Sequence, residues 1–389
     1  MDLLPRATIL ALLRSLARGE NATVGGTSLA DRLRVRIERE GSLRFDAFQE
    51  SALYDPDGGY YEKAGRVGRT GDFVTGASWH PAFARCLARI VARLADEIAP
   101  PVDVVDFGAG EGELLAFLSG ARPQGLGVRL AGVEASAARR VAAEARVPGA
   151  RFVASVADVP ASLEGLFVAY ELFDALPVRA LRVLEDGSLC ERRVGNGADG
   201  GFEWSDAPCP DGPELLARLA RRGALLEPGQ LLEVRPGAAA LAREIGARLE
   251  RGIFLVFDYG APTRALYGPA RANGTLEAFV GHCVTRDVLA DPGSRDITSW
   301  VDFTEIEMAL GDAGLTVHGL VSQSRLLLAS GIAGELLLPP GETDSPERAA
   351  ERNAVAKLVM PGGMGESIRV LVAERKTGLG KSLISSTLV

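Results

Sequence analysis

Short apolar runs alternate with longer stretches of mixed polarity along most of the chain, and this pattern predicts strands alternating with helices. The runs are rich in valine, leucine and isoleucine, as buried strands are. We expect strands at 102–107, 128–134, 151–155, 166–170, 253–260, 315–323 and 367–375. Because strands and helices alternate, we expect an α/β fold with a mainly parallel sheet and helices on both faces.

The stretches between these runs predict the helices and loops. Helices are expected at 28–40, 43–53, 80–99 and 302–313, with a longer helical region over 212–250. A hairpin is expected over 180–195, because Asp186-Gly187 favours a tight turn. Glycine and aspartate predict irregular structure at 54–75. A long irregular insertion is expected over 261–300, and a polar, poorly ordered tail over 376–389.

The run from Val104 to Leu118 predicts a buried strand, a glycine-rich turn and the start of a helix. Gly108, Gly110 and Gly112 stand at alternate positions, where the lack of a Cβ lets the backbone turn sharply and approach a ligand. The spacing differs from the G-x-G-x-x-G of dinucleotide sites, because the third glycine comes one residue early. A tight turn without a ligand is the alternative.

Acidic residues around this turn indicate the charge of the ligand. Glu111 and Glu113 stand where the phosphates of a dinucleotide would approach, so a cationic ligand fits better. S-adenosylmethionine (SAM) has an amino group and a sulfonium that suit acids, and a carboxylate that suits a helix start. Asp106 precedes the turn, and Glu134 ends the next strand, where an acid accepts hydrogen bonds from ribose hydroxyls. Asp158 is a further candidate for cofactor binding.

Acids also follow two later strands. Glu171 and Asp174 come after the fourth expected strand, and Asp258 and Tyr259 after the fifth. Ligands of such sheets bind beyond the carboxyl ends of the strands. We therefore expect five acids to converge on one rim: Asp106, Glu134, Glu171, Asp174 and Asp258. For any one of them, a helix cap or a solvated loop position is the alternative.

Composition narrows the class of function. The 389 residues are 47% hydrophobic and 24% charged, with a net charge of −8 and no basic run, which argues against sequence-independent binding of nucleic acid. The four cysteines form no C-x-x-C pair, which predicts a reducing, cytoplasmic location and no structural zinc. Three histidines make a metal cluster improbable, and no apolar run is long enough to cross a bilayer.

From about Arg36 to Arg375 the chain resembles the MidA/NDUFAF7-type family of SAM-dependent methyltransferases. The segments that carry the resemblance are FDAFQESALYDPDGGYY (Phe45 to Tyr61), GDFVT (Gly71 to Thr75), VVDFGAGEGEL, ELFDALPV (Glu171 to Val178), DYG, GTLEAF with His282, DIT, VDFT and KLVMPGGMGESIRVL (Lys357 to Leu371). The resemblance implies a class I methyltransferase core with helical additions that build a substrate cleft. The mitochondrial member of the family is a protein-arginine methyltransferase acting in complex I assembly.

The chain departs from the family pattern around the implied cleft. Gly76-Ala77-Ser78 stands where the family usually has Ser-Pro-Glu, and Gln49 stands for a methionine. Tyr170 replaces an asparagine, Glu277 an arginine and Trp300 a histidine. The elements expected to bind SAM are kept while their surroundings differ, which suggests a preserved methyl donor with an altered acceptor.

The resemblance and the residues together assign expected roles. Glu50, Glu171 and Asp174 are candidate catalytic carboxylates, because carboxylates hold a guanidinium through paired hydrogen bonds. His282 is a candidate base or acceptor-side partner, and Asp72 a candidate residue over the donor, although its segment could equally be a tight turn. The full expected cofactor set is Asp72, Asp106, Gly108, Gly110, Gly112, Glu134 and Asp158, with no metal.

We therefore expect a SAM-dependent methyltransferase that acts on a nitrogen, foremost an arginine of a protein or peptide. A small-molecule acceptor is the second hypothesis, and a non-catalytic assembly or binding protein the third; a nicotinamide-dependent oxidoreductase comes last because of the glycine spacing. No nucleic-acid or membrane partner is expected, and a homodimer is left open. The expected regions are a helical and cleft segment at 1–100, a SAM-binding core at 101–260, a substrate-cleft insertion at 261–335, a C-terminal strand region at 336–375 and a tail at 376–389.

Overall fold

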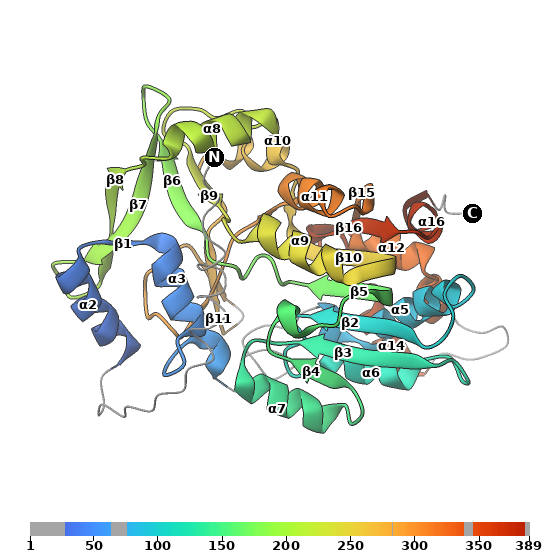
Figure 1. Ribbon diagram of the computed structural model, residues 1–389. Coiled ribbons are helices and arrows are strands. Elements are labelled where there is room, and N and C mark those ends of the chain that lie inside the picture. Colours follow the sequence, from blue (N-terminus) through green and yellow to red (C-terminus); the bar gives the residue numbers. More distant parts are fainter. Residues whose placement is uncertain (1–27, 64–75, 282, 338–344, 386–389) are drawn as a thin grey trace. The chain divides into compact units, whose positions relative to one another are not determined.

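The computed structural model describes residues 28–63, 76–281, 283–337 and 345–385 (Figure 1). The chain forms two compact units and passes between them several times. Unit 1 comprises Met1–Arg66, Ala175–Ala238 and Tyr267–Ser299, and unit 2 comprises Val67–Asp174, Ala239–Leu266 and Trp300–Val389.

Unit 2 is built on an eight-stranded mixed sheet. Its strands are β2 (Val102–Phe107), β3 (Val128–Val133), β4 (Arg151–Val153), β5 (Leu163–Tyr170), β10 (Leu249–Ala261), β14 (Val301–Asp302), β15 (Thr316–Ser322) and β16 (Ile368–Arg375). Seven of them follow the order β15-β16-β10-β5-β2-β3-β4, and β14 pairs with β10 beside this path. The pairs from β10 to β4 are parallel, whereas β16 runs antiparallel to both β10 and β15. The expected strands are all present, in a sheet that is mixed at one side.

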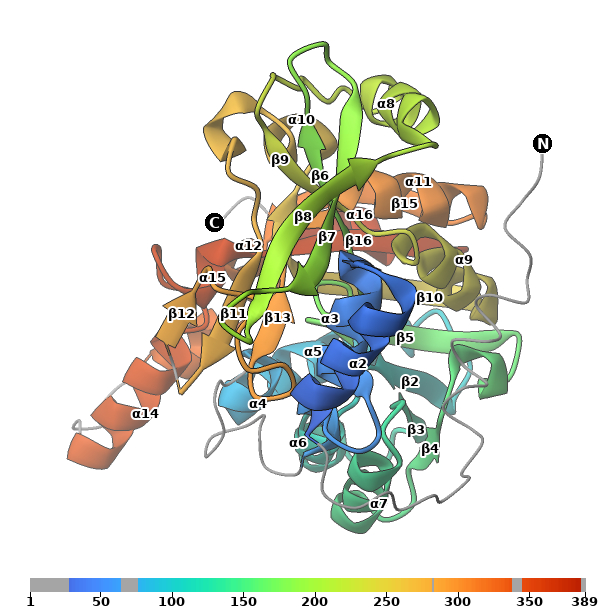
Figure 2. The same ribbon diagram turned by 90° about the vertical axis from the view of Figure 1, so that its left-hand side faces the viewer.

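Helices cover both faces of this sheet (Figure 2). They are α4 (Gly76–Trp79), α5 (Pro81–Leu94), α6 (Glu113–Ala121), α7 (Ala137–Arg146), α9 (Ala238–Arg248), α10 (Thr263–Leu266), α11 (Phe303–Asp312), α12 (Gln323–Ala329), α13 (Ala333–Leu336), α14 (Pro346–Ala356), α15 (Met364–Ser367) and α16 (Leu379–Ser385), with a 3-10 turn η2 (Val156–Asp158). On one face α5 buries Ala84, Leu87, Val91 and Leu94 at helical spacing, against Val104, Leu166 and Ile253 of the strands. On the other face the rings of Phe107, Phe167 and Phe254 pack together.

The described residues of unit 1 form two antiparallel sheets and three helices (Figure 2). The larger sheet has the order β1-β7-β6-β9 with β8 on the other edge of β7, where the strands are β1 (Leu43–Arg44), β6 (Arg179–Val183), β7 (Leu189–Asn196), β8 (Phe202–Pro208) and β9 (Leu231–Val234). The smaller sheet consists of β11 (Glu277–Val280), β12 (Cys283–Thr285) and β13 (Asp296–Thr298). The helices are α2 (Leu29–Glu40), α3 (Phe45–Tyr54) and α8 (Gly212–Arg221), with 3-10 turns η1 (Tyr60–Glu62) and η3 (Pro269–Arg271). The hairpin expected around Asp186-Gly187 is β6–β7.

Three local expectations differ from the structure. The region 212–250 holds the strand β9 between α8 and α9, and 261–300 holds the small sheet β11–β13, because these strands are too short to show a hydrophobic period. The expected tail forms α16, which buries Leu383 and donates the Gly380 N–H to the Glu374 carboxylate at 2.8 Å. Each element depends on contacts with distant segments, which sequence pattern does not reveal.

The division of the chain also differs from expectation. Helices α4 and α5 lie within the expected N-terminal segment, residues 1–100, but belong to unit 2. Residues Ala175–Ala238 lie within the expected core 101–260 but belong to unit 1. The apolar face of a helix or hairpin does not reveal which sheet it packs against, so the sequence pattern alone does not assign these segments to a unit. No described helix combines the length and apolar character that crossing a membrane requires.

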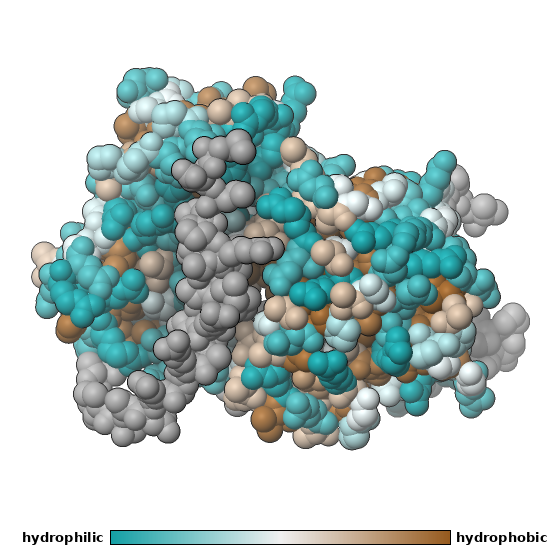
Figure 3. Space-filling model, in the orientation of Figure 1, coloured by the Kyte–Doolittle hydropathy of each residue, from teal (hydrophilic) through white to brown (hydrophobic). Residues whose placement is uncertain are grey.

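Where Figure 3 shows described residues, hydrophobic residues lie scattered among hydrophilic ones. Such scattering is usual for protein surfaces.

Candidate active site

The glycine-rich turn follows β2 directly and leads into α6. Gly108, Gly110 and Gly112 have φ angles of +82°, +55° and +81°. Residues other than glycine rarely adopt this left-handed backbone conformation. The N–H groups of Gly108 and Ala109 donate to the carbonyl of Val133 at 2.8 and 3.0 Å. The turn is therefore fixed to the carboxyl end of β3.

The three glycines have different surroundings. A Cβ on Gly112 would lie 3.2 Å from the Cβ of Ala143 in α7, so this glycine allows two helices to approach. A Cβ on Gly108 would lie 3.1 Å from a methyl of Leu172. A Cβ on Gly110 would meet no atom within 4 Å. Gly110 thus faces open space at the carboxyl ends of the strands, which is the position where a bound nucleoside would need free backbone.

Two of the expected cofactor acids lie at this turn. Asp106 is 4% exposed, and burial, followed by the charges of Glu134 and Glu113, raises its pKa to about 7. The Glu134 carboxylate accepts the N–H of Gly110 and the N–H of Ser136, each at 2.9 Å. One oxygen accepts each of these N–H groups, so the Glu134 carboxylate ties the turn at Gly110 to the residue that precedes α7.

Other acids near the turn have partners that the sequence did not indicate. Arg146, in the last turn of α7, forms ion pairs with Glu111 at 3.2 Å and with Glu113. Asp158 lies in η2 after β4, and its carboxylate accepts the hydroxyl of Ser155 at 2.7 Å. Arg146 lies far along the chain from both glutamates, so no local pattern could have revealed these pairs.

A second group of acids stands at the carboxyl ends of β5 and β10. Glu171 has a φ of +49° and donates its N–H to the carbonyl of Phe257 at 2.8 Å. Asp174 is 6% exposed. Burial and then the charges of Glu171, Asp174 and Asp258 raise the pKa of Tyr259. A left-handed residue other than glycine is typical of sites that the surrounding structure holds under strain.

Asp258 does not stand on the rim as expected. It is 0% exposed, and its carboxylate accepts the N–H groups of Phe173 at 2.9 Å, Asp174 at 3.2 Å and Tyr259 at 2.9 Å. Asp258 is buried and not on the rim because the buried backbone N–H groups of this loop need acceptors, and its carboxylate provides them. Asp258 therefore organises the loop that carries Glu171 and Asp174.

Three further expected site residues are not placed relative to this group. Glu50 belongs to α3 of unit 1, where burial and then the charge of Asp46 raise its pKa. Asp72 and His282 lie outside the described residues. The roles assigned to these three residues stay predictions.

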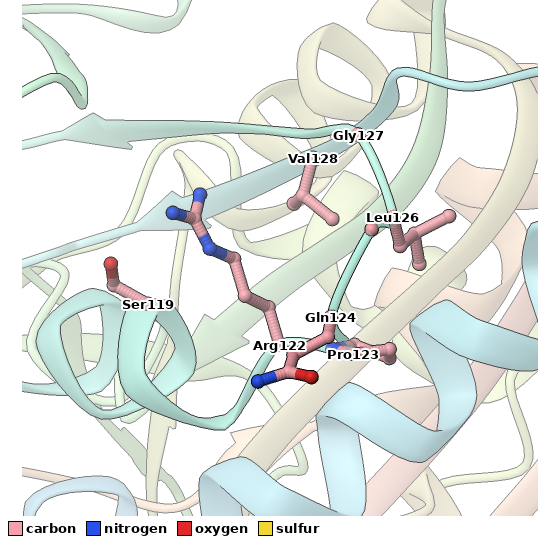
Figure 4. A pocket seen from close by; sticks show the side chains of 8 residues that line it. Ser119, Arg122, Pro123, Gln124, Leu126, Gly127 and Val128 are labelled. Carbon is pink, nitrogen blue, oxygen red and sulfur yellow. The ribbon is translucent and has the colours of Figure 1, made fainter.

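A surface pocket elsewhere on unit 2 is unrelated to this site. Figure 4 shows its lining, formed by the connection from α6 to β3: Ser119, Arg122, Pro123, Gln124, Gly125, Leu126, Gly127 and Val128. Val128 begins β3, so the pocket lies at the amino ends of the parallel strands, opposite to the edge that carries the glycine turn.

Comparisons with known proteins agree with the site. The family described as "Putative S-adenosyl-L-methionine-dependent methyltransferase" matches residues 83–321, more than half of the chain. A crystal structure of a COG1565 superfamily member from Burkholderia thailandensis, bound to S-adenosyl-homocysteine, is 32% identical with a TM-score of 0.81, and the match covers 99% of this chain and 98% of that chain.

Curated relatives are more distant. The protein arginine methyltransferase NDUFAF7 of Danio rerio, a mitochondrial protein, is 24% identical over 376 residues, which cover 87% of this chain and 85% of the relative. Its homolog in Drosophila melanogaster is 27% identical over 334 residues, 72% of this chain and 70% of the relative. The chain, with its glycine turn at the carboxyl end of β2, thus belongs to this family of SAM-dependent methyltransferases, and SAM is its cofactor.

Proposed function

We propose that the protein methylates a nitrogen of an arginine in a protein or peptide. The observation that supports this acceptor most directly is that Glu171 and Asp174 lie in one loop directly after β5, which the buried Asp258 carboxylate anchors through the N–H groups of Phe173 and Asp174. Carboxylates hold the planar guanidinium through charge-assisted, paired hydrogen bonds. The names of the curated relatives support the same class of acceptor.

The cofactor would be held by the residues of the glycine turn. The open backbone at Gly110 and the start of α6 suit its carboxylate, Asp106 suits its positive charge, and Glu134 suits its ribose hydroxyls. When bound, SAM supplies a methyl group that its sulfonium already activates toward a nucleophile.

The acceptor side requires orientation and removal of a proton. Glu171 and Asp174 would fix the plane of the guanidinium, which aligns one nitrogen and contributes through positioning, an effect that can reach about 7–11 kcal/mol in well-oriented reactions. A carboxylate beside the reacting nitrogen would also take up the proton that this nitrogen loses.

A small molecule is the second candidate acceptor. Gly76 and Tyr170 both depart from the family pattern, and the Tyr170 hydroxyl packs directly against the backbone of Gly76, one residue before Glu171. A paired change next to a proposed catalytic carboxylate favours an acceptor that differs from that of the relatives.

The acceptor can be tested with methyl-labelled SAM and a lysate of the host, with and without the protein. We expect the label to enter protein, and mass spectrometry of the labelled band to find methylated arginine. Label confined to small metabolites would support the second candidate. Binding of SAM without transfer of label to any fraction would contradict both candidates and favour a non-catalytic binding protein.

Two alanine substitutions in the turn should separate ligand binding from packing. Gly110→Ala and Gly112→Ala both place a Cβ on left-handed backbone, at a cost of about 1–2 kcal/mol each. Gly110→Ala should also raise the Kd of SAM about tenfold, because its Cβ enters the open space above the turn. Gly112→Ala should lose more stability than Gly110→Ala, because its Cβ presses on Ala143. Calorimetry and thermal unfolding measure the two effects, and equal Kd changes in both variants would contradict the assignment of Gly110.

Asp106 should make both stability and cofactor binding depend on pH. Folding raises the pKa of this carboxyl to about 7, so its stabilising contribution is present below its unfolded pKa and is lost as pH rises toward 7. The free energy of unfolding of the ligand-free protein should therefore fall between pH 5 and pH 8 by about 1–3 kcal/mol more in the wild type than in Asp106→Asn. Over the same range the ionised carboxylate favours a cation, so the Kd of SAM should fall in the wild type and change less in the variant. Parallel pH curves for the two proteins would argue against a raised pKa at Asp106.

A further inference from the structure

Tyr170 is the last residue of β5 and directly precedes Glu171. Its ring is 7% exposed and lies edge-on to Phe83 and stacked on Phe257, with ring centroids 5.3 and 5.2 Å away. Its hydroxyl donates to the side-chain oxygen of Gln323 at 2.7 Å and lies against the backbone of Gly76. The phenol is thus held both around its ring and at its oxygen.

Gly76 is required for this arrangement because of space. A Cβ at this position would clash with the Tyr170 hydroxyl and lie 3.1 Å from the Cζ of the same ring. The φ of Gly76 is not in the left-handed region, so backbone conformation does not demand a glycine here. A side chain at position 76 and a tyrosine at position 170 exclude each other.

Gln323 extends the contact into a chain of hydrogen bonds. It is 0% exposed at the start of α12, and its amide N–H donates to the carbonyl of Leu358 at 3.0 Å. The phenol of Tyr170 therefore connects the start of α4 and the start of α12 to the end of β5, all within unit 2. Burial and then the charge of Glu171 raise the pKa of Tyr170, so its hydroxyl stays a donor across the physiological pH range.

We propose that Tyr170, with Gly76 as its obligatory partner, is a positioning residue that fixes the backbone of Glu171 for methyl transfer. A non-glycine residue in left-handed backbone persists only where its neighbours hold it. On one side Glu171 is held by the hydrogen bond of its own N–H to Phe257, and on the other by the anchored Tyr170. This inference rests on the proposed role of Glu171 in binding the acceptor.

The test compares Tyr170→Phe, Gly76→Ala and the double variant with the wild type. Tyr267→Phe serves as a matched control, because Tyr267 is 4% exposed and donates its hydroxyl to the carbonyl of Glu233 at 2.8 Å in unit 1. Tyr170→Phe should lower kcat about tenfold with unchanged Kd for SAM, since small displacements of a positioning group are costly. Both substitutions should lower Tm by a similar few degrees, whereas Tyr267→Phe should keep the wild-type kcat.

The double variant tests the pairing without any acceptor. Gly76→Ala should lower Tm strongly in the presence of Tyr170 and clearly less in the presence of phenylalanine, because removal of the hydroxyl makes room for the Cβ. Additive changes in Tm would overturn the pairing, and an equal kcat in Tyr170→Phe and Tyr267→Phe would overturn the positioning role. Should the wild type label a small molecule instead of arginine, only the acceptor assignment fails, because kcat is then compared on that molecule.

Discussion

Asp258→Asn should lower the free energy of unfolding by about 2–4 kcal/mol and reduce methyl transfer by more than about a hundredfold. One oxygen of this fully buried carboxylate accepts the N–H groups of Phe173 and Asp174, and the other accepts that of Tyr259. Asparagine has only one side-chain oxygen, and its NH2 group would point N–H donors at the backbone N–H groups that Asp258 now accepts. At least one buried backbone group then loses its acceptor, and the loop that carries Glu171 and Asp174 loses its anchor.

Asp103→Asn is the matched control for this experiment. Asp103 is 4% exposed at the other end of the sheet, where its carboxylate accepts the N–H of Glu164 at 3.1 Å and pairs with Arg129. This substitution also removes a buried acceptor, so it should reduce stability while kcat, measured well below the Tm, stays unchanged. If both variants lost kcat in proportion to their stability, Asp258 would be a fold residue without a specific link to the site.

Asp258 also illustrates what the sequence could not reveal about the site. The sequence places it just past a buried strand, whereas in the structure it lies within β10, near the carboxyl end of that strand, and its environment depends on the partners of β10. In the structure Asp258 stands opposite Arg369 of β16 and beneath the loop after β5, both distant along the chain. An acid at a strand end has the same sequence signature whether it faces a ligand or satisfies the backbone of a neighbouring loop.

The central strands β2, β5, β10 and β16 of unit 2 were predictable because burial on both faces makes them largely apolar. The run at 102–107 has the bounds of β2, and all six of its residues are buried. The strands β9, β11 and β13 have only three or four residues each, and their pairing with distant partners, more than their own pattern, makes them strands. The short strands were not predicted because they have too few residues to show a hydrophobic pattern of their own.

The glycine turn after β2 and the positions of Glu134 and Glu171 just beyond β3 and β5 could be predicted from the sequence, because glycine and strand ends are local signals. The contacts that hold these residues were not. Gln323 and Tyr170 are 153 positions apart, and Arg146 reaches Glu111 and Glu113 across a helix and a strand. Side chains that act through others leave no motif of their own, so their assignment needed the three-dimensional structure.

Glu171→Gln should lower kcat by about 10²–10³-fold and leave the Kd of SAM nearly unchanged. Glutamine keeps the length of the side chain but removes the charge that would bind a guanidinium and accept its proton. Glu164→Gln, on the same strand at its other end, is the control and should keep wild-type kcat. Rates measured with labelled SAM, together with calorimetric Kd values, distinguish loss of chemistry from loss of cofactor.

A second substitution separates the charge of Glu171 from its backbone conformation. Glycine accepts the φ of +49° without strain, so Glu171→Gly should unfold at the same or a slightly higher temperature than the wild type. If the carboxylate performs the proposed role, this variant is as inactive as Glu171→Gln despite its relieved backbone. Wild-type kcat in Glu171→Gly would mean that the strained residue serves only the turn, and the acceptor would then depend on Asp174 alone.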